Sequence, residues 1–557
     1  MIVAAHKNEE QRPALHFTPK RGFMNDPNGL VYSKGVWHLY YQLDDRSLVA
    51  GRPEWGHATS TDLLNWKRHE KAIKAPSDSE SIYSGCCVVD YNNTSGQFDE
   101  ESTDPDDRIV AIYTLHHNLQ GGEHHQMQNV AFSYDGGCTF TQYKHNPVLD
   151  LGWSDFRDPK VLWHAPSNQW VMVVAKCHQF RLGFYGSPDL VRWHHLSDFE
   201  GSGVRGYQYE MPDLVQVPFD DDRTRKKWVL FLSIGPGGAP LGGGSFTQYF
   251  LGDFDGTTFV SDDNYLRTAD WGKDWYAAQT WFVHDSPHDG GEGEDEDEDE
   301  VCGIGWASNW QYCNRVPAQR HRSAMSLPRK FTVREVPLNP TTKSLSLISR
   351  PVDLDGVRLP RISSHSDNNT NTNGMVDYTN GSANTNPKVN HISMKEEEEE
   401  VIIYKRHMNA QSGSFEFKLK INLRTRPPAR VSVDISNPSG HSVRLHFVFE
   451  NQEGMFISMD RGRIRTGSSW DHPLFDDKVS MWVPNTQGSD YDVHVVIDAY
   501  VCELFALDGA YAFTNTFFLE DGVASTLTVS RDKTSADVTA EVLDVYELCP
   551  LKASTAE

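Results

Sequence analysis

Three acidic residues of this chain stand beside prolines: Asp26 in FMNDPNGL, Asp158 in DFRDPK and Glu210 in YEMPDL. In each segment the proline follows the acid at once or after one residue, and a β-type run comes next. Proline lacks a backbone donor and restricts the local geometry, so it can hold a neighbouring acid rigidly at a strand edge. Asp-Pro is also a plain turn former, so one such segment alone indicates a turn rather than a site.

Three carboxyl groups brought together by one fold would suit the cleavage of a glycosidic bond. In the retaining form of this reaction, one carboxylate attacks the anomeric carbon and a second carboxyl group, about 5 to 5.5 Å away, protonates the leaving oxygen. Such a pair needs different surroundings, which raise the pKa of the acid and keep the nucleophile ionised. The three segments together therefore predict a carbohydrate-cleaving site, provided that the elements around them converge.

The elements around the acids are short alternating strands closed by polar turns, such as GLVYSKGVWHLYYQ and VLWHAPSNQWVMVVAK. Related phrases follow several of these hairpins and place Asp62, Asp135, Asp189 and Asp255 at spacings of 73, 54 and 66 residues. Irregular repetition of a four-strand unit predicts a β-propeller, which removes exposed sheet edges by radial repetition. We expect about five blades, and the central channel where the first strands converge is the place for the acids.

The second part of the chain is again a series of strands, without helical stretches, which indicates a two-sheet sandwich. Between the two parts, a run rich in Asn, Ser and Thr leads into consecutive glutamates and contains almost nothing that can be buried. The fold class is therefore all-β, a five-bladed β-propeller followed by a C-terminal β-sandwich. The expected boundaries are 12–350 for the propeller, 351–400 for a low-complexity linker and 401–550 for the sandwich.

Charge and composition exclude several partners. Lys and Arg number 52 against 77 Asp and Glu, which gives a net charge of −25 and argues against nucleic acid, although the acidic runs 294–300 and 396–400 carry much of it and are expected to be solvated loops. No stretch approaches the roughly 20 apolar residues that cross a bilayer, so no membrane partner is expected.

The eight cysteines include no C-x-x-C pair, and the first residues turn charged before any signal-like region develops. These features favour a cytoplasmic location, or secretion if the chain begins after a removed signal.

FMNDPNGL, FRDP and E-x-P-D-L, in this order, resemble the three signature motifs of glycoside hydrolase family 32, the invertase, inulinase and levanase family. Further matches include WGHATSTDLLNW, DWYAAQT and GWASNWQYCNRVP, so the resemblance covers nearly the whole chain. It implies a propeller, a sandwich and retaining cleavage of a terminal β-fructofuranosyl group. It also implies that Asp26 is the nucleophile, Glu210 the general acid/base and Asp158 the carboxylate that stabilises the transition state.

The resemblance further implies a set of residues that contact the sugar, because amide and guanidinium groups can orient a polyol by paired hydrogen bonds. Trp310 is either a sugar-stacking residue or part of the core. The expected substrate-binding residues are Asn25, Gln42, Trp55, Ser84, Arg157 and Trp310.

Two positions depart from the family pattern. Met211 stands where cysteine usually follows the acid/base, which puts a bulkier thioether beside Glu210. Ala50 stands where the first tryptophan of W-G-x-x-x-W-G-H is usual, although Trp55 keeps the second. Loss of that aromatic wall would widen the site, loosen sucrose binding or favour another acceptor, and the sequence leaves these alternatives open.

The sequence thus predicts a β-fructofuranosidase that acts on sucrose and short fructans without a metal or organic cofactor. A fructosyltransferase, an exo-inulinase or levanase, and an inactive sugar-binding homologue remain alternatives. The expected partner is a small-molecule sugar. The sandwich shows no comparable acidic cluster, so we expect it to serve in packing or in forming a homodimer.

Overall fold

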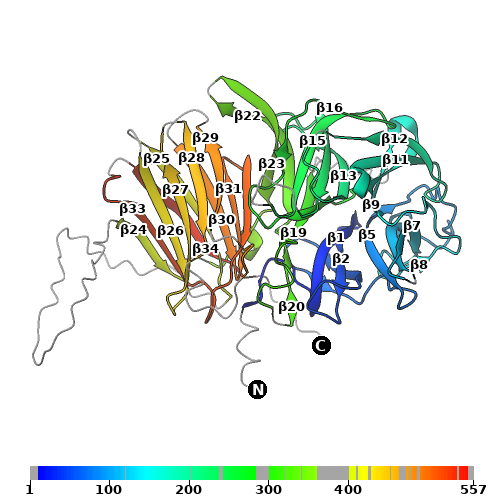
Figure 1. Ribbon diagram of the computed structural model, residues 1–557, viewed down its shortest axis with the longest axis horizontal. Coiled ribbons are helices and arrows are strands. Elements are labelled where there is room, and N and C mark those ends of the chain that lie inside the picture. The colour runs from blue at the N-terminus through cyan, green and yellow to red at the C-terminus, as the bar shows by residue number, and fades with distance from the viewer. Residues whose placement is uncertain are drawn as a thin grey trace, which may run out of the picture.

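The computed structural model shows two bodies of β-sheet packed side by side (Figure 1). It describes residues 11–549 except 120, 202, 237–242, 284–299, 319, 340, 361–399, 409–411, 424–427, 452, 463–471, 476–477, 486–489 and 536–537. Short 3-10 turns are the helical elements in this described part, and none of its helices is long and apolar enough to span a membrane.

The first body is a β-propeller, whose described residues form five sheets. The first is β1 (Gly22–Ser33), β2 (Val36–Asp44), β3 (Glu54–Ser60) and β4 (Lys67–Arg68), joined by β20 (His321–Arg322); the second is β5 (Glu80–Val89), β6 (Ile109–Asn118), β7 (His124–Ser133) and β8 (Thr141–Gln142). The third is β9 (Phe156–His164), β10 (Gln169–Lys176), β11 (Arg181–Ser187) and β12 (His194–Phe199); the fourth is β13 (Tyr209–Pro218), β14 (Lys226–Ile234), β15 (Phe246–Phe254), β16 (Phe259–Ser261) and β17 (Arg267–Thr268). The fifth is β18 (Tyr276–Thr280), β19 (Val301–Ala307), β21 (Ala324–Met325), β22 (Arg329–Asn339) and β23 (Thr342–Pro351). The innermost strands β1, β5, β9, β13 and β18 contact one another in that order, and β18 returns to β1.

The repeated aspartates predicted from the sequence mark one recurrent turn. In four blades the aspartate follows the third strand. Its carboxylate accepts hydrogen bonds from backbone N–H groups in the turn that leads to the fourth strand. These residues are Asp62, Asp135, Asp189 and Asp255. This is the local bonding by which aspartate favours turns. The repeat is therefore a structural device of the blades.

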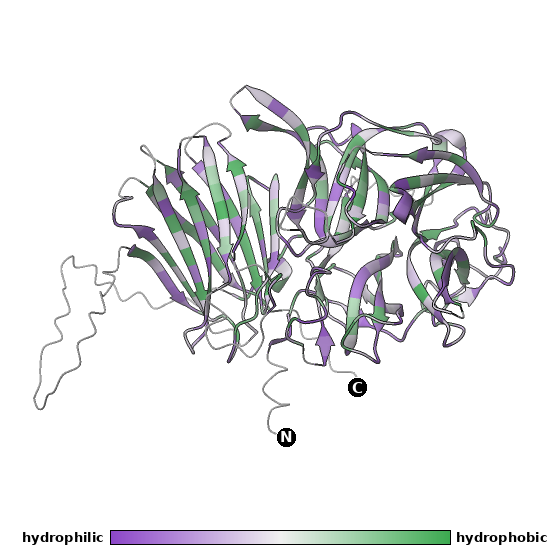
Figure 2. Cartoon of the chain, in the orientation of Figure 1, coloured by the Kyte–Doolittle hydropathy of each residue, from purple (hydrophilic) through white to green (hydrophobic). Residues whose placement is uncertain are grey.

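The second body is a sandwich of two antiparallel sheets. One contains β24 (Glu400–His407), β33 (Thr526–Asp532), β26 (Ala429–Ser436), β27 (Ser442–Phe449), β28 (Gly454–Asp460) and β29 (Lys478–Pro484); the other contains β32 (Tyr511–Thr516), β31 (Val501–Ala506), β30 (Asp490–Asp498), β25 (Ser414–Leu423) and β34 (Val538–Glu547). Buried and partly exposed residues alternate strictly along β27, as half-buried strands require. Figure 2 shows hydrophobic and hydrophilic residues mixed along these strands. The predicted all-β class, a propeller followed by a sandwich, is confirmed.

Most of the predicted linker, 361–399, lies outside the described residues, as do positions 294–299 of the first acidic run. Glu300, the described end of the first run, lies outside the strands just before β19, whereas Glu400 lies in a strand, which corrects the expectation of a solvated loop for that residue. Glu300 pairs with Lys330 at 2.5 Å, and Glu400 opens β24 and pairs with Arg444 at 3.0 Å. Val352, just inside the predicted linker, is buried, and the boundary at 351 stays a prediction.

Candidate active site

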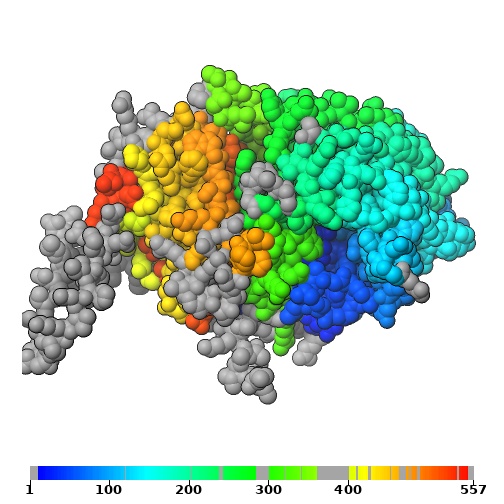
Figure 3. Space-filling model, in the orientation of Figure 1, coloured from blue at the N-terminus to red at the C-terminus, as the bar shows by residue number. Residues whose placement is uncertain are grey.

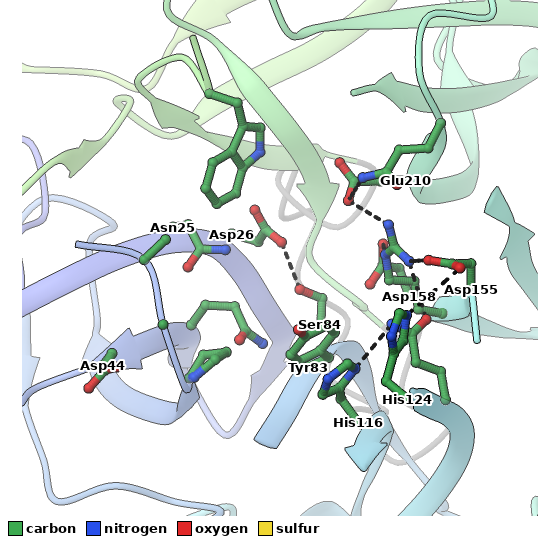
Figure 4. A pocket seen from close by; sticks show the side chains of 18 of the residues that line it. Asn25, Asp26, Asp44, Tyr83, Ser84, His116, His124, Asp155, Asp158 and Glu210 are labelled. Carbon is green, nitrogen blue, oxygen red and sulfur yellow. Dashed lines mark hydrogen bonds and ion pairs between the residues drawn. The ribbon is translucent and has the colours of Figure 1, made fainter. Parts of the chain in front are cut away.

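A pocket of about 600 Å³ opens at one end of the ring of innermost strands. Each of these strands brings a polar side chain to it or to its wall: Asp26 on β1, Ser84 on β5, Arg157 on β9, Glu210 on β13 and Tyr276 on β18. Figure 4 shows Asp26, Ser84, Asp158 and Glu210, one from each of the first four blades, around one shared space. The three acids of the acid-proline segments, Asp26, Asp158 and Glu210, therefore line one pocket, as predicted.

All five innermost strands are irregular where they meet the pocket. Their pairing registers shift between Met24 and Pro27, Ile82 and Gly85, Arg157 and Lys160, Glu210 and Asp213, and Tyr276 and Gln279. Such bulges re-aim side chains beside active sites. Pro159 and Pro212 lie in two of them and Pro27 borders a third, positions that suit a residue without a backbone donor. Asp158 and Met211 adopt left-handed φ angles of 63° and 49°, a local strain that is typical of functional sites.

Ser84 and Asn25 both face Asp26 in this site. The Ser84 hydroxyl donates to Asp26 Oδ2 at 2.8 Å, whereas Asp26 Oδ1 is buried without a hydrogen-bond partner. Burial and the charge of Glu210 raise the pKa of Asp26 to about 6, against the opposing effect of Ser84. A carboxylate with an uncommitted oxygen is chemically suited to attack an electrophilic carbon.

Asp158 is fixed from two neighbouring strands. Its Oδ2 accepts the backbone N–H of Met211 at 3.1 Å, and its own N–H donates to Thr114 Oγ1 at 3.0 Å. Burial raises the pKa of Asp158 to about 7; Arg157 opposes this rise, while the charges of Glu210 and Asp26 add to it. The three carboxyl groups thus repel one another inside the pocket, and a bound polyol would relieve that repulsion by donating hydrogen bonds.

Glu210 is surrounded by donors. Its Oε1 accepts from Arg157 Nη2 at 3.0 Å and from Gln208 Nε2 at 2.9 Å, and its Oε2 accepts from the hydroxyl of Tyr276. The guanidinium also donates to Asp155 Oδ1 at 3.2 Å, so Arg157 is itself held in place. Glu210 and Asp26 therefore sit in different surroundings. The raised pKa of Asp26 is the reverse of the expectation that its surroundings keep the nucleophile ionised.

The other predicted contact residues divide into two groups. Asn25, Gln42 and Trp310 line the pocket together with Ser84 and Arg157. Trp55 does not, which corrects its assignment as a sugar contact: its side chain is fully buried in the core between the first two blades. Its indole N–H donates to the carbonyl of Tyr83 at 3.0 Å, so Trp55 supports a pocket residue from behind.

The two departures from the family pattern have different consequences. Ala50 lines the pocket, so the small side chain borders the space for the sugar. Met211 points its thioether into the hydrophobic core and is 2% exposed, so the sulfur does not line the pocket beside Glu210. Only the backbone N–H of Met211 serves the site, through Asp158.

Comparison with known proteins decides the family. The model of the glycosyl hydrolases family 32 N-terminal domain matches residues 16–348, and that of the family's C-terminal domain matches residues 377–547. The chain belongs to glycoside hydrolase family 32. As a member of this family, it is a glycoside hydrolase.

Relatives of this family 32 chain extend over nearly its full length. It is 38% identical to the invertase of Wickerhamomyces anomalus over 98% of this chain and 96% of that protein. It is 41% identical to an extracellular exo-inulinase of Meyerozyma guilliermondii, over 92% and 90% of the two chains. The β-fructofuranosidase of Schwanniomyces occidentalis complexed with fructosyl-erythritol superposes with a TM-score of 0.79 at 36% identity, covering 96% and 97% of the two chains.

Several residues of this family 32 site were not singled out from the sequence. Tyr276 lies in DWYAAQT, a phrase that carries the family resemblance, so its position was a usable signal. Gln208 and Asp155 are close in sequence to the acids but carry no motif of their own. Tyr83 stacks on His116 with ring centroids 4.5 Å apart along one wall of the pocket. Tyr83 directly precedes the predicted contact Ser84 in the matching phrase YSG, whereas no pattern in the sequence pointed to His116.

Proposed function

We propose that the chain is a retaining β-fructofuranosidase that releases terminal non-reducing β-D-fructofuranosyl residues from sucrose and short fructo-oligosaccharides. The observation that carries this proposal is the pair formed by Asp26 and Glu210, which face one pocket: Ser84 donates to Asp26, whereas Arg157, Gln208 and Tyr276 donate to Glu210. Relatives named invertase and exo-inulinase, and a related structure complexed with fructose, support the substrate class.

The reaction would take two steps. Asp26 attacks the anomeric carbon of the fructosyl group, the bond to the leaving oxygen breaks, and Glu210 gives its proton to that oxygen. Glu210 then takes a proton from water, whose oxygen attacks the same carbon and frees Asp26. Asp158 would accept hydrogen bonds from the sugar hydroxyls and Arg157 would donate to them, which would orient the ring and stabilise the transition state.

Transfer of the fructosyl group to a second sugar is the close alternative. It uses the same covalent intermediate, with a sugar hydroxyl in the place of water. Ala50 at the pocket wall favours this alternative, because the small side chain leaves room for an acceptor. Exo-inulinase or levanase activity differs only in the leaving group.

The test measures free glucose and free fructose over time from sucrose at low and at high concentration. Equal release at both concentrations identifies hydrolysis, and an excess of glucose at high sucrose identifies transfer. Asp26→Asn is the control, and it should lose turnover by about 1,000-fold or more while keeping the fold. Unchanged sugar release by that variant would remove Asp26 from its role.

The remaining alternatives are separated by further substrates. Inulin and levan come next if sucrose is not cleaved, and calorimetric binding of fructose without any turnover would identify an inactive sugar-binding homologue. The cytoplasmic location and the homodimer stay predictions, to be tested by cell fractionation and by gel filtration.

A further inference from the structure

Backbone hydrogen bonds join the sandwich to the propeller segment that leads into β18. Trp271 N–H donates to the carbonyl of Ala512 at 2.8 Å, and Asp274 N–H donates to that of Thr514 at 3.1 Å, so this propeller segment runs beside β32 of the sandwich. The approach is so close that a Cβ on Gly272 would lie 2.0 Å from the carbonyl oxygen of Thr514. A glycine is therefore required at this crossing.

Asp274 is the fully buried centre of this junction. Its Oδ2 accepts from Thr516 N at 2.8 Å, from Thr516 Oγ1 at 2.9 Å and from Arg461 Nη1 at 3.1 Å, all of which belong to the sandwich. Its Oδ1 accepts from the hydroxyl of Tyr312, a propeller residue. A buried carboxylate with four donors is a strongly defined position, because losing any donor leaves charge uncompensated.

Among the described residues, Arg461 is the cation that forms an ion pair with Asp274. Both side chains are fully buried. Its Nη1 also donates to the carbonyl of Thr516 at 2.8 Å, and its Nη2 reaches the Tyr312 hydroxyl at 3.4 Å. The guanidinium lies over the ring of Phe475, 3.6 Å from its centroid. This planar, many-donor arrangement is specific to arginine.

Asp274 and Tyr312, the two propeller residues bonded to Arg461, each lie two positions in the sequence from a residue at the active site. Asp274 precedes Tyr276, whose hydroxyl donates to Glu210. Tyr312 follows Trp310, which lines the pocket. The two segments are also joined directly, because the side chain of Asn309 donates to the carbonyl of Lys273 at 2.7 Å.

We propose that Arg461 of the sandwich is a positioning residue of the active site, because it fixes Asp274 and Tyr312 and thereby the propeller segments that carry Tyr276 and Trp310. This proposal rests on the proposed function, since it assigns Arg461 to the same pocket. It gives the sandwich a part in catalysis in addition to packing. Figure 3 shows the surfaces of the two bodies in contact along this side of the last blade.

Arg350 offers a matched control at the same domain interface. It pairs with Asp508 of the sandwich at 2.6 Å and with Asp220 of the propeller at 2.9 Å, so it too joins the two bodies. Arg350 lies near the end of β23, however, and its partners Asp220, Asp508 and Thr332 do not line the pocket. A variant of Arg350 therefore weakens the interface without touching the catalytic wall.

The experiment compares Arg461→Met, Arg461→Lys, Tyr312→Phe and Arg350→Met in the full chain. For each, kcat and KM on sucrose are measured from pH 4 to 8, fructose binding is measured by calorimetry, and the thermal midpoint reports folding. We expect Arg461→Met to lose about 10-fold in kcat/KM, mostly in kcat, with a displaced pH profile. Arg461→Lys should recover part of the loss, and Arg350→Met should stay within about 2-fold of the parent.

Three outcomes would overturn the proposal. One is a folded Arg461→Met with the parental kcat, KM and pH profile; the second is a loss of activity in Arg350→Met as large as that in Arg461→Met. The third outcome concerns Tyr312→Phe, which deletes a single hydroxyl and decides the question if Arg461→Met does not fold. Parental kinetics for Tyr312→Phe would then overturn the proposal. A parent that binds fructose without cleaving any fructoside would refute the proposed function alone, and Arg461 would then be judged by the loss of fructose binding.

Discussion

At the scale of single residues, the pocket gathers carboxyl groups that cost stability when they ionise. Burial and the charge of Glu210 raise the pKa of Asp26 from its ordinary value near 3.8 to about 6. Between these two values the folded protein binds more protons than the unfolded chain, so the free energy of unfolding falls as the pH rises. The ionised nucleophile therefore destabilises the fold at neutral pH, as residues poised for reaction often do.

We predict that Asp26→Asn is inactive and more stable than the parent at pH 7. The shift of Asp26 corresponds to at most about 3 kcal/mol, and contact of the pocket with solvent lowers that figure. Asparagine is isosteric, and its oxygen can still accept from Ser84. Thermal unfolding at pH 7 and at pH 4 measures the effect: the advantage of the variant should shrink at pH 4, where Asp26 of the parent is protonated. A variant less stable than the parent at pH 7 would contradict this account.

At the scale of elements, a buried ion pair joins three innermost strands just below the bulges. Lys160 Nζ on β9 donates to Asp213 Oδ2 on β13 at 2.9 Å and to the carbonyl of Thr280 on β18 at 2.6 Å. Lys160 is 5% exposed and Asp213 is not exposed at all. Lys160 lies two residues beyond Asp158, so the pair fixes the strands where they turn toward the pocket.

We predict that Lys160→Met destabilises the protein by about 3 to 5 kcal/mol, because it leaves Asp213 charged and buried without its partner. Adding Asp213→Asn should recover at least half of that loss, since asparagine can still accept from Thr280. Lys227→Met is the control: its partners Asp253 and Asp262 are 85% and 36% exposed, so the loss should stay within about 1 kcal/mol. Urea unfolding compares the three variants with the parent, and a loss below about 1 kcal/mol in Lys160→Met would show that the pair does not hold the strands.

The fold could be predicted from strand patterns and turn residues, because both depend on residues that are neighbours in the sequence. The alternation of β27 and the repeated aspartates, Asp62 among them, are written in neighbouring residues, and the structure confirmed what they predict. The burial of a side chain depends instead on residues that are distant in the sequence. A motif match placed Trp55 at the sugar, whereas packing between two blades buries it. Arg461 contacts residues far away in the chain, Asp274 and Tyr312 among them, so its place could not be assigned from its own surroundings in the sequence.

At the scale of the whole molecule, a buried ionic network joins the beginning of the chain to the sandwich. His16 contacts Asp498 Oδ2 through Nδ1 at 2.8 Å and Glu503 Oε1 through Nε2 at 3.0 Å, with all three side chains fully buried. Glu503 also pairs with Arg329 of the propeller. Burial alone would lower the pKa of His16, but the bonds and charges of Asp498 and Glu503 raise it to about 9. The charge of Arg329, with the His16 bond, outweighs burial and lowers the pKa of Glu503 to about 2.

These shifts predict how the stability of the assembled domains depends on pH. A folded pKa of about 9 for His16 lies above its ordinary value of 6.5, so its contribution is complete below pH 6.5 and is lost as the pH rises through 9. The contribution of Glu503 is complete above pH 4.5 and is lost toward pH 2. The network should therefore stabilise the protein most between these limits.

We predict that His16→Gln lowers the thermal midpoint clearly at pH 6 and much less at pH 9.5, where the parent has lost its imidazolium. The protonation of His16 is worth at most about 3 kcal/mol by its shift. His407→Gln is the control, because His407 lies exposed on β24 and its variant should leave the pH profile unchanged. Thermal unfolding from pH 5 to 9.5 gives the difference between parent and variant at each pH. A difference that stays constant across this range would mean that His16 does not change its charge there, and that the network joins the domains by neutral hydrogen bonds.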